Sequence, residues 1–137
     1  MNNIDTRQIA TYGLLSILSI IVLFHLLVIC GIIPFEIVWG GRLKDFSQMI
    51  VFETISISLN LVMLFVVASD ASLIKLKLNS LIIRIGLWTM CALFILNTAG
   101  NLLSNNETER LVFTPLTVLL SVFSFRLAVS RKTGGNN

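Results

Sequence analysis

Four long runs of apolar residues, separated by short polar segments, make up most of the chain. An α-helix needs about 20 apolar residues to cross the hydrocarbon core of a bilayer, and each run is long enough. The predicted spans are residues 11–33, 49–69, 81–103 and 111–130. The pattern therefore predicts an all-α polytopic membrane protein, with a single four-helix transmembrane domain and a flexible tail at residues 131–137.

The connections between the spans are short, so consecutive helices should be antiparallel neighbours in an up-down bundle. Charged residues make up only 12% of the chain and hydrophobic residues 55%, whereas soluble domains are about one quarter charged. Too few polar side chains remain to cover a surface in water. Because the basic residues are scattered along the chain, we expect the lipid bilayer, and not nucleic acid, as the partner of this surface.

The distribution of lysine and arginine predicts the orientation, because cytoplasmic loops carry an excess of both residues. One side of the membrane would carry Arg7, Lys75, Lys77, Arg84, Arg126, Arg131 and Lys132. The other side would carry Arg42, Lys44 and Arg110. We therefore expect both termini to be cytoplasmic, in a bacterial inner membrane.

Polar residues inside the spans fall on narrow helical faces, since residues three or four apart share a face. Glu53, Ser56 and Asn60 lie on one face of the second span, and Asn97 and Asn101 lie on or beside one face of the third. The fourth span carries a stripe of small residues: Thr114, Thr117, Ser121, Ser124 and Ala128. These faces should point into the bundle, because polar groups in lipid are costly and are usually buried.

The polar residues of the first three spans lie in the predicted outer half of the bundle, which indicates an outward-opening pocket. Its candidate lining residues are His25, Glu53, Asn60, Asn97 and Asn101. A carboxylate at the depth of Glu53 must be paired, protonated or hydrated. Glu53 would be either a proton- or cation-binding group or one half of a structural ion pair with Arg42 or Arg110.

His25 and the asparagines have alternative interpretations too. His25 would either shuttle protons or stay neutral in a structural hydrogen bond. The asparagines would either contact a ligand or join helices through hydrogen bonds.

The first outer loop contains the sequence Pro34-Phe35-Glu36-Ile37-Val38-Trp39-Gly40-Gly41-Arg42. One interpretation is a re-entrant lid over the polar residues, with Arg42 reaching Glu53. The other is an interfacial tether with Trp39 as an aromatic anchor. Near the start of the fourth span, Pro115 removes a backbone donor and should kink the helix.

The sequence lacks the motifs of common hydrolases and nucleotide-binding enzymes, and its single histidine excludes a bis-histidine haem within one chain. We expect no catalytic residues, no metal and no cofactor. An enzyme is therefore the least favoured class.

Several segments carry a resemblance to a group of small bacterial four-helix membrane proteins. They are His25, Gly31-Ile32-Ile33-Pro34, Trp39-Gly40-Gly41-Arg42, Phe52-Glu53, Ser56, Asn60, 96–102 and 113–117. The resemblance covers nearly the whole chain and implies the same fold, but it brings no known activity.

Two functions remain open. The leading one is binding of a small polar ligand, lipid headgroup or proton in the pocket, in connection with transport. The alternative is a structural subunit of a membrane complex, and a homo-oligomer or another membrane protein is an expected partner in either case.

Overall fold

The computed structural model describes residues 5–131, and in this range the protein is helical without strands. The long helices are α1 (Thr6–Ile29), α2 (Phe46–Asp70), α3 (Ser80–Leu102) and α4 (Thr114–Ser130). A π-helical turn, η3 (Glu109–Phe113), leads directly into α4. All four helices are long and apolar enough to cross a membrane, which confirms the predicted all-α integral membrane protein. Of the predicted tail at 131–137, residues 132–137 lie outside the described residues.

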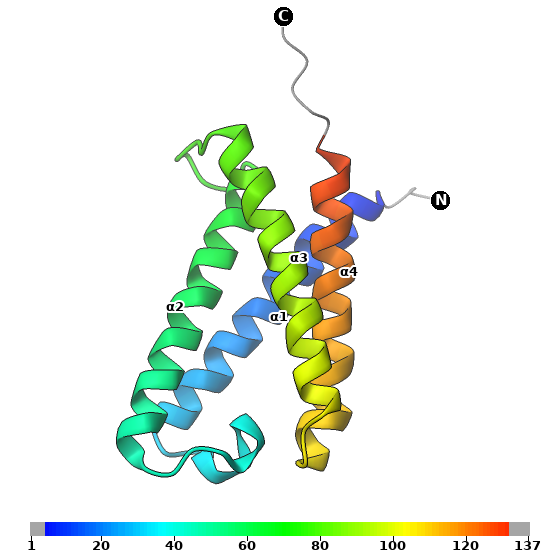
Figure 1. The fold of residues 1–137 in the computed structure, drawn as a ribbon. Coiled ribbons are helices and arrows are strands. Elements are labelled where there is room, and N and C mark those ends of the chain that lie inside the picture. The colour runs from blue at the N-terminus through cyan, green and yellow to red at the C-terminus, as the bar shows by residue number, and fades with distance from the viewer. Residues whose placement is uncertain (1–4, 132–137) are drawn as a thin grey trace, which may run out of the picture.

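The helices run up and down, so that the connections α1–α2 and α3–α4 lie at one end of the bundle (Figure 1). We call this the Trp39 end, and we call the opposite end, where α1 begins and α4 ends, the Asp70 end. α1 packs along α2 and α4, and α3 packs along α4, whereas α2 and α3 make far less contact. The ribbon shows α2 diverging from α3 toward the Trp39 end.

The contact between α2 and α3 is closest near the Asp70 end. A Cβ atom added to Gly86 of α3 would lie 3.1 Å from a methyl group of Val66 on α2, so the missing side chain permits this approach. Buried apolar residues from all four helices form a core around this level. These core residues include Leu14, Leu18, Met63, Val67, Leu87, Met90, Phe94, Leu120 and Leu127.

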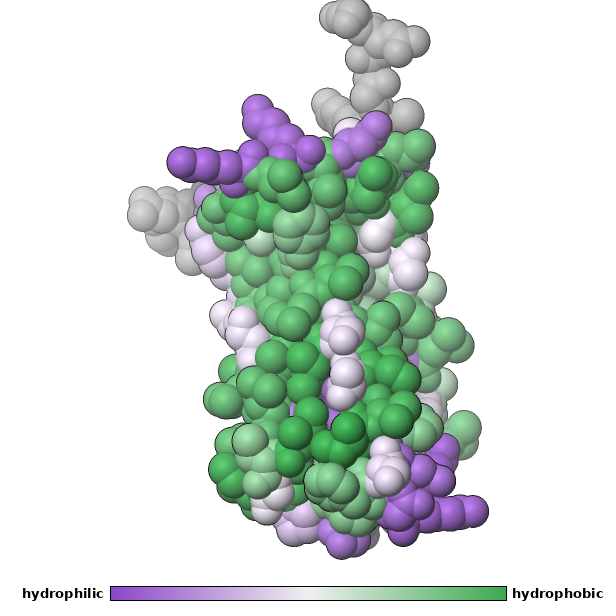
Figure 2. All heavy atoms as spheres, turned by 90° about the vertical axis from the view of Figure 1, so that its left-hand side faces the viewer, coloured by the Kyte–Doolittle hydropathy of each residue, from purple (hydrophilic) through white to green (hydrophobic). Residues whose placement is uncertain are grey.

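The outer surface carries many exposed leucine, isoleucine, valine and phenylalanine side chains. Figure 2 shows them as a broad hydrophobic band between hydrophilic residues at the two ends. In water this surface would be unfavourable, but in a bilayer it faces lipid tails. The band therefore agrees with a membrane-spanning bundle.

Backbone capping sets the ends of α1. Asp5 accepts a hydrogen bond from the Arg7 backbone N–H and starts the helix at Thr6. At the other end, Gly31 adopts φ +72°, and the N–H groups of Gly31 and Ile32 donate to the carbonyls of Val28 and Leu27. This is a Schellman motif, for which glycine is the favoured residue. α1 therefore ends before Gly31, earlier than the predicted end ahead of Pro34.

The fourth span begins with the π-helical turn η3, and Pro115 occupies the first turn of α4. Because η3 runs directly into α4, Pro115 lies inside a continuous helical stretch and removes one backbone donor from it. The sequence predicts a kink at Pro115, and the irregularity that the structure shows is the π-helical turn η3 immediately before it.

A single buried carboxylate joins all four helices at the Asp70 end. The Asp70 side chain is fully buried at the end of α2, and it accepts hydrogen bonds from Arg7 Nη2 at 2.9 Å and Arg131 Nε at 2.5 Å. Arg131 Nη1 also donates to the Ser80 hydroxyl at 2.9 Å and to the Ser80 carbonyl. The start of α1, the end of α2, the start of α3 and the end of α4 are therefore linked. Arg131, assigned by sequence to the tail, is part of this cluster.

We expect Asp70→Asn to lower the free energy of unfolding by roughly 3 kcal/mol, because it leaves two arginines without their carboxylate. Thermal unfolding in dodecyl maltoside measures the effect. The control is Glu36→Gln, which neutralises an exposed carboxylate in the first outer loop. Equal melting temperatures for the two variants would show that the bundle does not depend on Asp70.

Candidate functional site

Glu53 lies near the start of α2, and none of its surface is exposed. Trp39 Nε1 donates to its Oε1 at 2.8 Å, and His25 Nδ1 lies 2.5 Å from its Oε2. The two partners come from different segments, α1 and the first outer loop. A buried carboxylate is costly unless it is hydrogen-bonded or paired, so this arrangement binds the loop to the helix pair α1–α2.

His25 is oriented by Glu53. When a histidine donates through Nδ1 to a carboxylate, Nε2 is left for another partner. No hydrogen bond involves His25 Nε2 within residues 5–131, and the side chain lines a cavity between the two halves of the bundle. Glu53 itself is absent from the cavity lining. The Glu53 carboxylate therefore lies behind His25 and Trp39, and these two side chains form part of the cavity wall.

The backbone at Trp39 is strained, and the contacts of its side chain hold it in this conformation. Trp39 has φ +55°, and Gly40 and Gly41 follow with φ +65° and +68°. A bulky residue with positive φ is a genuine outlier, and such strain clusters at functional sites. The indole is held by Glu53 and by an edge-to-face contact with Phe52, with ring centroids 5.1 Å apart. Val38, just before it, is buried against the outer ends of α1 and α2.

A second buried carboxylate, Glu109, holds the same loop from the other half of the bundle. The Gly40 N–H donates to Glu109 Oε1 and the Ser104 hydroxyl to Oε2, both at 2.6 Å. Asn106 Nδ2 also donates to the Ile37 carbonyl at 2.8 Å. A Cβ on Gly40 would lie 3.4–3.5 Å from Ser104 Oγ and Glu109 Oε2, so glycine suits both the positive φ and the close approach. The first outer loop thus spans the Trp39 end from α2 to η3.

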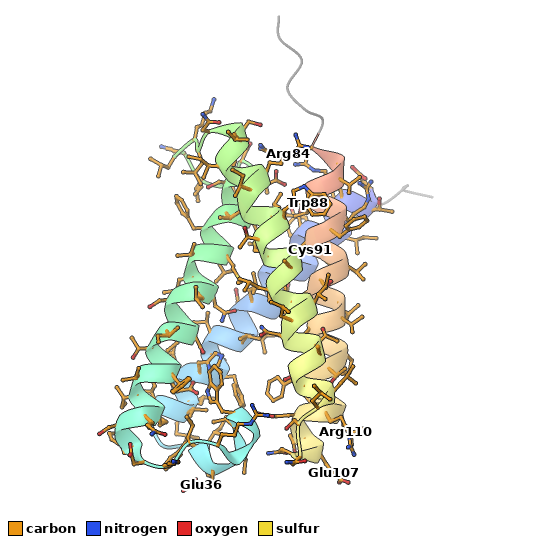
Figure 3. The ribbon with its side chains drawn as sticks, viewed as in Figure 1. Glu36, Arg84, Trp88, Cys91, Glu107 and Arg110 are labelled. Carbon is orange, nitrogen blue, oxygen red and sulfur yellow. The ribbon has the colours of Figure 1, made fainter. Side chains whose placement is uncertain are left out.

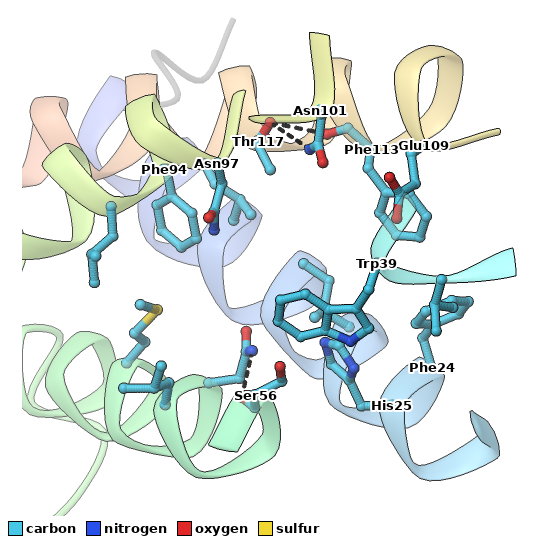
Figure 4. A pocket seen from close by; sticks show the side chains of 17 residues that line it. Phe24, His25, Trp39, Ser56, Phe94, Asn97, Asn101, Glu109, Phe113 and Thr117 are labelled. Carbon is cyan, nitrogen blue, oxygen red and sulfur yellow. Dashed lines mark hydrogen bonds between the residues drawn. The ribbon is translucent and has the colours of Figure 1, made fainter. Parts of the chain in front are cut away.

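Under this loop lies a cavity of about 280 Å³ between the two halves of the bundle (Figure 4). Its walls are mostly apolar and aromatic, with a few polar side chains directed inward. The polar lining residues are His25, Trp39, Ser56, Asn60, Asn97, Asn101, Glu109 and Thr117. A groove lined by Gln48 and Phe52 of α2 and by Leu96 and Gly100 of α3 adjoins it and shares Asn97. The cavity therefore lies where α2 and α3 diverge.

The three asparagines predicted to line a pocket all do so, but their partners differ. Asn101 donates weakly across to Thr117 of α4 at 3.5 Å, which joins two helices. Asn60 donates to the Ser56 carbonyl of its own helix. The Asn97 side chain makes no hydrogen bond within residues 5–131, although it lines both cavity and groove. Asn97 is therefore the polar group most available to a ligand.

Neither predicted arginine partner reaches Glu53. The ion pairs of the described residues join Asp70 to Arg7 and Arg131, and Glu53 to His25. Arg42 is exposed and lines the groove, and Arg110 is exposed at the base of α4 near Glu107 (Figure 3). Trp39 occupies the place beside Glu53 that one hypothesis gave to Arg42. The loop does cover the polar residues, with the indole and not the guanidinium as the group that reaches Glu53.

Sequence reasoning missed Glu109 and the role of the Trp39 side chain. Glu109 lies at the end of a polar run, Ser104-Asn105-Asn106-Glu107, that resembles an ordinary exposed loop. Its spacing of five residues from Ser104 gives no periodic signal. The Trp-Gly-Gly sequence was a usable signal, because two consecutive glycines allow the positive φ angles that turn the indole inward.

Comparisons with protein-family models, with curated proteins and with solved structures each find no match. Among residues 5–131, no group of three or more histidine, cysteine, aspartate or glutamate side chains is arranged to hold a metal ion. The chemistry of the site therefore has to be argued from its own side chains, which donate and accept hydrogen bonds and carry charge.

We expect Trp39→Phe to destabilise the protein by roughly 1–3 kcal/mol, because Glu53 Oε1 would lose its donor while staying buried. Trp88→Phe is the matched control, since Trp88 is 42% exposed, Trp39 is 38% exposed, and Trp88 donates no hydrogen bond within the described residues. Thermal unfolding of both variants gives the comparison.

A double-mutant cycle isolates the hydrogen bond from the loss of indole packing. In a Glu53→Leu background, which has no acceptor for the indole N–H, Trp39→Phe should cost less than in the wild type. Additive effects of the two substitutions would contradict a coupling between the indole and the carboxylate.

Proposed function

We propose that this integral membrane protein binds a small molecule or a lipid through a polar group that enters the cavity between α2 and α3. The observation that carries the proposal is a set of inward-facing polar groups without full protein partners, namely His25 Nε2 and the side chains of Asn60 and Asn97. In a membrane, polar groups that do not bond the protein need another partner.

The cavity has the make-up of a ligand site. Small-molecule pockets are mostly apolar, with a few convergent polar groups that fix orientation. Here Phe24, Phe94 and Phe113 contribute aromatic walls, and His25 and Asn97 contribute polar groups from two different helices. Pure helix packing would favour small residues and fully bonded polar side chains. The open seam and the unpartnered Asn97 support binding over a purely structural role.

The route of entry follows from the divergence of α2 and α3. The groove next to the cavity is lined by residues of both helices and by Arg42 of the loop. A ligand would enter sideways between the two helices at the Trp39 end. An amphipathic molecule fits this route, because its apolar part can stay among the lipid-facing side chains while its polar part reaches Asn97.

We propose further that the Trp39 end faces outward and that the membrane is a bacterial inner membrane with cytoplasmic termini. Most of the basic residues at the two ends favour this orientation. Arg7, Lys75, Lys77, Arg84, Arg126 and Arg131 belong to segments at the Asp70 end, and Arg42, Lys44 and Arg110 to segments at the Trp39 end. The cavity would then open in the outer half of the bilayer.

Native mass spectrometry of protein extracted in mild detergent tests the binding function. We expect the wild type to retain a small molecule or a specific lipid, and Asn97→Phe to lose it because the larger ring fills the cavity. Ile95→Phe is the control, since Ile95 is exposed and lines neither cavity nor groove. A bare wild-type chain, or one bound only to another protein, would favour the structural subunit.

A reporter fusion tests the orientation. Alkaline phosphatase fused to the C-terminus should be inactive, because this enzyme folds only outside the cytoplasm, and a fusion in the loop between α3 and α4 should be active. The reverse pattern would show that the termini lie outside the cytoplasm and that the cavity opens in the cytoplasmic half of the bilayer.

A further inference from the structure

We infer that the polar group bound in the cavity is an ammonium group, held by Glu109, Asn97 and the aromatic walls. This inference rests on the proposed function, since it specifies the chemistry of the ligand in the same cavity. It starts from the charge of Glu109, a side chain that lines both the cavity and the groove.

Glu109 has hydrogen-bond partners but no counter-charge. Its residue is 9% exposed, and both oxygens accept from neutral donors, the Gly40 N–H and the Ser104 hydroxyl. No ion pair within residues 5–131 includes it. Its position in the first turn of the fourth span also favours a negative charge, because helix N-termini carry a partial positive charge. A buried charge without a partner is costly, so a cation arriving beside Glu109 would be stabilised.

The His25–Glu53 pair does not supply the missing charge. Two buried carboxylates, Glu53 and Glu109, lie at this end of the bundle, and His25 is already bonded to Glu53. Among residues 5–131, neither lysine nor arginine lines the cavity. Anionic ligand groups are therefore disfavoured deep in the cavity, and cationic ones are favoured.

The walls of the cavity suit an ammonium group in particular. Phe24 and Phe113 meet edge to face with ring centroids 5.3 Å apart, and Trp39 and Phe94 line the same space. Figure 4 shows Glu109 beside Phe113 and Trp39, with Asn97 and Phe94 farther along the cavity. Aromatic faces attract cations, and desolvated aromatic cages are the usual receptors of quaternary ammonium groups. Asn97, which also lines the cavity, offers a carbonyl oxygen that can accept from a primary ammonium or contact a quaternary one through its dipole.

Arg42 is the nearest competitor for this carboxylate. A Cβ atom added to Gly40 would lie 3.4 Å from Arg42 Nε and 3.5 Å from Glu109 Oε2, so both side chains approach the same point. No ion pair joins Arg42 and Glu109, however. Arg42 is exposed and lines only the groove. A bound ammonium would therefore contact Glu109 from the cavity side, and Arg42 beside the groove would weaken its binding without closing the route of entry.

The ammonium group has two possible sources, a free organic cation or an amine headgroup of a lipid. Benzyltrimethylammonium serves as the probe for the first, and neopentylbenzene, its neutral carbon isostere, is the matched control ligand. The full chain carries Trp88→Phe, so that Trp39 in the cavity wall is its only tryptophan. Trp39 emission is titrated in dodecyl maltoside, a detergent without any ammonium group.

We expect saturable quenching by benzyltrimethylammonium and a Kd that rises by about tenfold or more in Glu109→Gln, because truncating one partner of a buried charge pair weakens binding. Glu107→Gln, an exposed carboxylate two residues away, should leave the Kd unchanged. Arg42→Gln should lower the Kd, because it removes the competing cation. Melting temperatures of all three variants show whether they stay folded.

The lipid source is tested in nanodiscs that contain equal amounts of phosphatidylethanolamine and phosphatidylglycerol. Preferential retention of phosphatidylethanolamine in native mass spectrometry, lost in Glu109→Gln, supports the inference with a lipid as ligand. Equal Kd values for the cation and its neutral isostere, or for wild type and folded Glu109→Gln, overturn it while leaving the cavity a binding site. If no probe perturbs Trp39 and no lipid is retained, the proposed function itself fails.

Discussion

The burial of Glu53 within an apolar helix is the constraint on which the rest of the Trp39 end depends. A carboxylate there cannot be left without partners, and the protein provides them from α1 and from the first outer loop. The loop must therefore fold over the Trp39 end, and Trp39 must accept a positive φ to direct its indole inward. The loop covers the end of the bundle, and Trp39 lines the cavity, because the loop supplies a hydrogen-bond donor to Glu53.

The bundle is made of two helix pairs, α1–α2 and α3–α4, that are joined by polar contacts at both ends and by the packing of α1 on α4. At one end Asp70 bonds Arg7 and Arg131, and at the other Glu109 and Asn106 bond the backbone of the first outer loop. Between these ends α1 packs on α4, while α2 and α3 diverge (Figure 1). The seam can remain open because the polar contacts at both ends hold the pairs together.

The polar residues of the spans divide into two kinds of role. Asn101 and Thr117 bond across helices, as membrane polar residues commonly do. His25 and Asn97 keep an atom or a whole side chain free toward the cavity. The sequence pattern placed Asn97 and Thr117 on polar stripes of their helices, Asn101 beside one and His25 alone on its face, and all four side chains line the cavity. It could not distinguish the two roles, because both need a polar group pointing inward.

The sequence alone determined the four apolar helices, their up-down order and the helix faces that carry His25 and the asparagines, since hydrophobic length and helical periodicity are local properties. Tertiary structure decided the partners. Glu53 binds Trp39 and His25 instead of an arginine, Arg131 joins Asp70, and Glu109 turns from a loop residue into a cavity wall. These outcomes depend on how far α2 diverges from α3 and how the first outer loop folds back, and both are set by contacts between residues far apart in the chain.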